Sequence, residues 1–121
     1  MRYKRIIIES PFAGDVKLNK AYLNAAIRDC ILNHNEAPYA SHKLYVDGLD
    51  DNNPDERAAG IEAGFAWGEC VQYVVVYFDL GISDGMRLGI ENAKVLGKNV
   101  IMRKLPDDAM DNLRKKYWWC L

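Results

Sequence analysis

The hydrophobic positions form two kinds of run that alternate along the chain. Short unbroken runs rich in β-branched residues are typical of strands buried on both faces of a parallel sheet. These runs, the second of them short and ambiguous, occupy residues 4–9, 37–42, 72–78 and 100–103. In the longer segments between them, apolar residues recur every three or four positions, which predicts amphipathic helices. The predicted helices occupy residues 18–34, 54–70, 85–96 and 106–116.

Strands that alternate with helices predict an α/β fold joined by right-handed crossovers. We expect one three-layer domain spanning residues 1–121, with a four-stranded parallel sheet in the order 2-1-3-4 and helices on both faces. The strands at 4–9 and 72–78 would be central, as their uninterrupted apolar runs require. Ligands bind such sheets at the carboxyl ends of the strands. The loops at 10–15 and 79–86 would therefore meet there.

Composition excludes several classes of function. Half of the 121 residues are hydrophobic, 27% are charged and the net charge is −1, so no global basic field favours a nucleic acid polymer. No stretch approaches the ~20 apolar residues of a membrane span. The three cysteines are far apart and give no zinc or disulfide pattern. We expect a cytoplasmic protein (host cytoplasm if it is phage-encoded) without metal or cofactor.

The loop at 79–86 suits a polar ligand, phosphorylated or ribosylated. Gly81 and Gly85 let the backbone approach a ligand closely, and Ser83 or Asp84 can cap the following helix. The start of that helix presents unpaired N–H groups and a partial positive charge, which favours an anion. Arg87, in its first turn, could add a bidentate phosphate contact. A helix cap and turn without any ligand is the alternative.

Further residues complete the predicted site. Asp79 ends its strand and could accept hydrogen bonds from ribose hydroxyls, while Phe12, Tyr45, Tyr77 and Met86 could form a stacking wall for a base. The predicted ligand-binding set is Ser10, Pro11, Phe12, Gly14, His42, Tyr45, Asp79, Gly81, Ser83, Asp84, Gly85, Met86 and Arg87.

Two segments carry a family resemblance. Residues 8–14 (Ile-Glu-Ser-Pro-Phe-Ala-Gly) and 79–101 resemble the opening strand and the strand–loop–helix–strand of nucleoside 2-deoxyribosyltransferase-like proteins. With the helix at 57–68, the chain is more similar still to a family of small phage and bacterial domains with this fold, over residues 4–104. The resemblance implies a pocket shaped for a nucleoside or nucleotide.

The transferase reaction needs a carboxylate nucleophile early in the helix after the glycine loop. Depending on the alignment, that position holds Arg87 or Gly89, and neither is an acid. An arginine cannot be deprotonated to act as a nucleophile. If the protein is an enzyme, Glu9, Glu62 or Glu91 would have to supply the carboxylate.

Three functions follow, and whether the protein is an enzyme stays open. The first is non-catalytic binding of a nucleotide-derived small molecule, a nucleotide second messenger or an ADP-ribose derivative, as in a phage anti-defence protein that sequesters its ligand. The second is an enzyme on an N-glycosidic bond, a deoxyribosyltransferase or a nucleotide N-glycosidase. The third is a protein–protein interaction module.

Two features suggest contacts between copies of the chain. Gly60, Gly64 and Gly68 share one side of a helix, which indicates close approach of another backbone, either within the fold or in a partner. Trp118 and Trp119 lie in an aromatic tail that either covers the core or contacts a partner. We expect a homo-oligomer.

Overall fold

The computed structural model describes residues 2–40, 48–50 and 52–119. The elements are β1 (Lys4–Glu9), α1 (Val16–His34), β2 (Glu36–Tyr39), α3 (Pro54–Ala66), the 3₁₀ helix η1 (Trp67–Cys70), β3 (Tyr73–Tyr77), α4 (Asp84–Val95), β4 (Asn99–Arg103) and α5 (Asp107–Lys116). The strands pair in parallel in the order β2-β1-β3-β4. The predicted fold class and strand order are confirmed.

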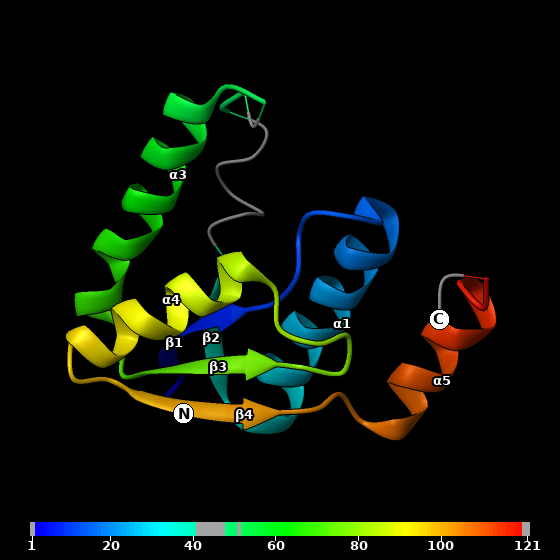
Figure 1. Cartoon of the computed structure of the whole chain (residues 1–121). Coiled ribbons are helices and arrows are strands. Elements are labelled where there is room, and N and C mark those ends of the chain that lie inside the picture. Colours follow the sequence, from blue (N-terminus) through cyan, green and yellow to red (C-terminus); the bar gives the residue numbers. More distant parts are fainter. Residues whose placement is uncertain (1, 41–47, 51, 120–121) are drawn as a thin grey trace.

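The helices form layers on both sides of the sheet. In Figure 1, α4 lies along one face and α1 lies behind the other, while α3 stands beside α4 and extends away from the strands. Gly64 is the only buried residue of α3, so this helix contributes little to the core.

The alternation of side chains along β1 divides the core into two clusters. Ile6 and Ile8 pack on the α1 side with Tyr22, whereas Ile7 packs on the α4 side with Val74 and Ala93. Successive residues of a strand point to opposite faces, so the same rule assigns every strand residue to one side. It also decides which polar side chains can reach a ligand.

Two helices have ends that differ from the predicted ones. α1 begins two residues before the predicted start because Asp15 caps it, with Oδ1 accepting a hydrogen bond from the Leu18 N–H at 3.0 Å. The predicted helix at 54–70 is α-helical only to Ala66 and ends in the 3₁₀ turn η1.

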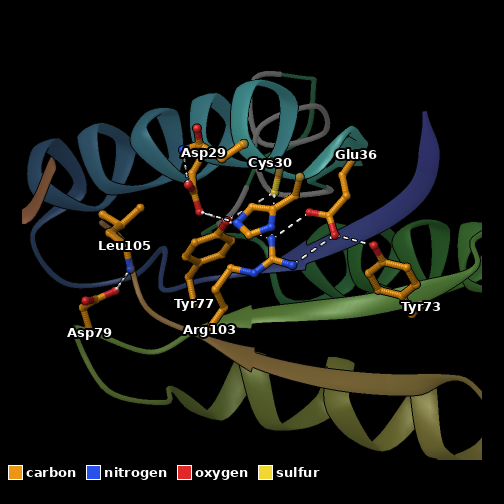
Figure 2. A network of polar contacts seen from close by, with 10 residues as sticks. Asp29, Cys30, Glu36, Tyr73, Tyr77, Asp79, Arg103 and Leu105 are labelled. Atoms are coloured by element: carbon orange, nitrogen blue, oxygen red, sulfur yellow. Dashed lines mark hydrogen bonds and ion pairs between the residues drawn. The ribbon is translucent and has the colours of Figure 1, made fainter. Parts of the chain in front are cut away.

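A buried polar network joins the two edge strands on the α1 side of the sheet (Figure 2). Glu36 of β2, 1% exposed, accepts two hydrogen bonds from the Arg103 guanidinium of β4, at 2.7 and 3.0 Å. The Tyr73 hydroxyl donates to the same carboxylate. Burial opposes ionisation of Glu36, but these donors outweigh it and hold its pKa below the usual range. The pair therefore stays charged inside the protein.

Tyr77 extends this network to α1. Its hydroxyl donates to Asp29 Oδ2 at 2.7 Å and accepts from Arg103 Nη1 at 3.2 Å. The network thus fixes α1 and both edge strands to the centre of the sheet.

Removing one side of the buried ion pair should be costly. We expect Arg103→Met to lower the free energy of unfolding by about 3–5 kcal/mol, because it leaves the Glu36 carboxylate buried without its partner. Urea unfolding measures this loss. The double variant Glu36→Leu/Arg103→Met should recover much of it, and a single variant within 1 kcal/mol of the wild type would show that the pair is not a structural tie.

Candidate functional site

A cavity of about 370 Å³ lies on the α4 side of the sheet. Ile7 and Val74 form its floor, and its walls come from α3, α4 and the loop after β1. It includes the loops after β1 and β3, where the sequence predicted a site, and extends to Lys98, which precedes β4 at the opposite edge of the sheet. Its volume is in the range of small-molecule pockets.

The structure brings only part of the predicted residues together. Those that line the cavity are Glu9, Ser10, Phe12, Ser83, Asp84, Gly85 and Met86. Those that do not line it are Pro11, Gly14, Glu62, Asp79, Gly81, Arg87 and Glu91. His42 and Tyr45 lie outside the described residues, as does the helical turn expected near 44–46.

The loop after β1 is held in place by a side chain from α1. Asn19, which is buried, donates hydrogen bonds from Nδ2 to the carbonyl oxygens of Phe12 and Ala13, both at 2.9 Å. Gly14 then turns the chain at φ +98°, a left-handed conformation that favours glycine. Gly14 therefore shapes the loop without lining the cavity.

The start of α4 faces the cavity. Ser83 caps it, its Oγ accepting from the Met86 N–H at 3.2 Å, which confirms one of the two predicted caps. Beside Gly85 there is open space, since an added Cβ would meet only Ser83 Oγ, at 4.0 Å. A ligand can thus approach the helix backbone where the dipole favours an anion.

Arg87 and Glu91 lie on the other side of α4. Gly85, Gly89 and Ala93 line the cavity at intervals of four residues, which leaves positions 87 and 91 about half a turn away. Arg87 is exposed and pairs with Asp84 at 3.2 Å. The expectation that Arg87 contacts a ligand phosphate from inside the site is therefore not supported by its position.

Asp79 and Tyr77 lie on the α1 side of the sheet (Figure 2), and neither lines the cavity. Asp79 Oδ1 accepts hydrogen bonds from the Tyr22 hydroxyl at 2.6 Å and from the Leu105 N–H at 2.9 Å. Tyr77 is fully buried in the polar network and cannot form a stacking wall. Alternation along β3 puts Tyr77 on the side of Val75, and Asp79, in the turn after β3, contacts α1 on the same side. Both expectations are therefore corrected.

Several cavity residues were missed at the level of sequence. They come from α3, from the last turn of α4 and from the turn after it: Glu56, Arg57, Ile61, Phe65, Asn92 and Lys98. The glycine spacing gave the signal for α3, because Gly60, Gly64 and Gly68 all line the cavity. A Cβ at Gly68 would lie 2.7 Å from Leu96 Cδ1, so η1 approaches the end of α4 closely there.

Glu9 is the one candidate catalytic carboxylate that enters the cavity. It follows Ile7 on the α4 side of β1, and its carboxyl group lies against Gly89. Burial raises its pKa to about 8. Within the described ranges no hydrogen bond or ion pair to this carboxyl group offsets the burial. At neutral pH the neutral acid therefore predominates by about ten to one.

Two searches of the described residues were negative. No helix there is long and apolar enough to cross a membrane. No group of three or more His, Cys, Asp and Glu side chains in that part of the chain could hold a metal ion.

Residues 4–103 match the model of a family described as a domain of unknown function (DUF7768). The chain belongs to this family. No curated protein matches it. Every residue that lines the cavity falls inside the matched segment, whereas α5 and the aromatic tail follow it. The cavity is thus a feature of the DUF7768 domain itself.

The raised pKa of Glu9 predicts a pH dependence of stability. Between pH 4.5 and about 8 the unfolded chain ionises Glu9 while the folded protein keeps it protonated. The free energy of unfolding should therefore fall with rising pH, by at most about 1.4 kcal/mol per unit from this group. Urea unfolding of Glu9→Gln at pH 5, 7 and 9 should lack this component, so the variant gains on the wild type as pH rises.

Glu62→Gln, on the exposed side of α3, is the matched control and should follow the wild-type profile. If the free energies of unfolding of the wild type and of Glu9→Gln changed with pH in parallel, the raised pKa of Glu9 would be contradicted.

Proposed function

We propose that the cavity binds a nucleotide-derived small molecule and holds it without turnover. The observation that carries this proposal is the composition of the cavity wall. Aromatic and aliphatic side chains, among them Phe12, Phe65 and Met86, line the cavity together with the capped start of α4. A flat base suits these side chains and a phosphate suits the helix start.

The cavity wall also carries two cationic side chains, which suit a phosphate-bearing ligand. Arg57 of α3 and Lys98, in the turn after α4, both line the cavity. Arg57 is exposed, and its guanidinium can bind phosphate oxygens in a bidentate manner. Lys98 Nζ donates to the Glu69 carbonyl oxygen at 3.3 Å, which holds the ammonium group near the far end of α4.

The residues at the candidate nucleophile positions favour binding over glycosyl transfer. Arg87 faces away from the cavity, and Gly89 has no side chain. Glu9 enters the site but is mostly protonated near neutral pH, and a protonated carboxyl group is a poor nucleophile. A binder of this kind fits the proposed role of sequestering a nucleotide second messenger or an ADP-ribose derivative, as in phage anti-defence.

One observation favours a second candidate, an enzyme that cleaves an N-glycosidic bond. A neutral carboxyl group in a cavity can act as a general acid and protonate a departing base. Among Glu9, Glu62 and Glu91, only Glu9 is placed for this role.

A retention experiment separates the two candidates. The protein is incubated with nucleosides, nucleotides, cyclic dinucleotides, NAD and ADP-ribose, separated from free ligand, heat-denatured and analysed by mass spectrometry. We expect intact ligand in the released fraction. Free base or a new glycoside would support the enzyme, and neither retention nor turnover would reject both candidates.

Arg57 and Arg87 provide a matched pair of variants for the phosphate end. We expect Arg57→Ala to weaken a phosphate-bearing ligand by about tenfold or more, because charged hydrogen bonds contribute ~1.5–3 kcal/mol. Arg87→Ala removes the same group outside the cavity and should bind as the wild type does. Calorimetric titration measures both, and the reverse order of effects would place the phosphate outside this cavity.

The aromatic tail supports a proposed homo-oligomer. Trp118 and Trp119 are 72% and 65% exposed and stack edge to face, whereas Tyr117 packs against the core. Gly60, Gly64 and Gly68 already face the cavity, so the tail is the better candidate for a subunit contact.

Light scattering after size exclusion should show the full chain as an oligomer and a chain that ends at Lys116 as a smaller species. A monomer in both cases would remove the tail as a contact.

A further inference from the structure

We infer that the Glu9 carboxyl group recognises the neutral, base-bearing end of the ligand by donating its own proton in a hydrogen bond. The acceptor on the ligand would be a carbonyl oxygen or an unprotonated ring nitrogen of a heterocycle. This inference rests on the proposed function and names the residue that sets which part of the ligand lies at the end of β1.

The position of the carboxyl group depends on a glycine. A Cβ built on Gly89 would overlap the Glu9 carboxyl group, and even its more distant oxygen, Oε1, would lie only 2.6 Å away. No side chain at position 89 can coexist with this arrangement. The carboxyl group therefore has the backbone of α4 on one side and the cavity on the other.

Among the residues that the structure describes, the charged groups around the cavity leave Glu9 without a counter-ion. Those that line it are Glu56 and Arg57 from α3, Asp84 from α4 and Lys98 after α4, with Tyr39 from β2 as the further titratable group. In the described part of the chain, none of them makes a hydrogen bond or an ion pair with Glu9. An ionised carboxylate would be desolvated without compensation, and the neutral acid is what the site accommodates.

The neutral form of Glu9 also allows an anion to bind nearby without charge repulsion. Gly85 precedes Gly89 by four residues, slightly more than one helical turn, a rise of ~6 Å. A phosphate at the start of α4 would therefore lie one turn from the Glu9 carboxyl group. A neutral acid there avoids the like-charge repulsion that a carboxylate would impose, and it supplies a donor that a carboxylate lacks.

Calorimetric titration with ADP-ribose at pH 6 and pH 9 tests the inference. A phosphate monoester would be a poor probe because its charge changes near pH 6, whereas the diphosphate diester of ADP-ribose does not titrate in this range. About a tenth of Glu9 is protonated one unit above a pKa of about 8. We expect wild-type affinity to fall about tenfold from pH 6 to pH 9.

Two variants locate the effect. Glu9→Gln keeps a donor that cannot ionise, so it should bind ADP-ribose about equally at both pH values. Glu91→Gln makes the same chemical change on the exposed side of α4 and should lose affinity as the wild type does.

The outcomes separate the two proposals. Equal wild-type affinity at pH 6 and pH 9, or a tenfold loss that persists in Glu9→Gln, overturns the role of Glu9 and leaves the proposed binding function standing. Absence of ADP-ribose binding by the wild type at pH 6 overturns the inference for this ligand, and the retention experiment then decides whether the binding function stands.

Discussion

The structure depends on a simple constraint, the alternation of side chains along the two central strands. In β1 it sends Ile6 and Ile8 toward α1 but Ile7 and Glu9 toward α4. One acidic residue at the end of a buried strand thus enters the cavity. Asp79, beyond the end of β3, lies on the opposite side. There its carboxylate accepts hydrogen bonds from the Tyr22 hydroxyl and the Leu105 N–H and so links α1 to the segment after β4.

The two sides of the sheet have different polar chemistry. On the α1 side, Glu36 and Arg103 are buried together and satisfied, so their charges stabilise one another. On the α4 side, Glu9 is half-buried against Gly89 without such a partner among the described residues, and its neutral form is favoured instead. A satisfied network suits a structural role, whereas an acid that faces a cavity suits contact with a ligand.

The sequence predicted the fold and the place of the site because strand runs, helix spacing and the parallel order are local or topological signals. It did not predict which side of an element each candidate faces. Alternation along the strand, continued from Val75 to position 79, would have assigned Asp79 to the α1 side. Helical spacing from Gly85 would have placed Arg87 on the other side of α4, outside the site. The contribution of Arg57 depends on how α3 stands over the sheet, a tertiary relation that no local pattern encodes.

The central claim is that Glu9 is a neutral acid facing a ligand cavity. Carbon-detected NMR of the protein labelled with ¹³C at the glutamate carboxyl group, with Glu9→Gln to assign the signal, measures its titration directly. The account predicts a midpoint near pH 8 for Glu9 in the ligand-free protein. A midpoint near the ordinary value of 4.5 would show a solvated carboxylate and contradict the account.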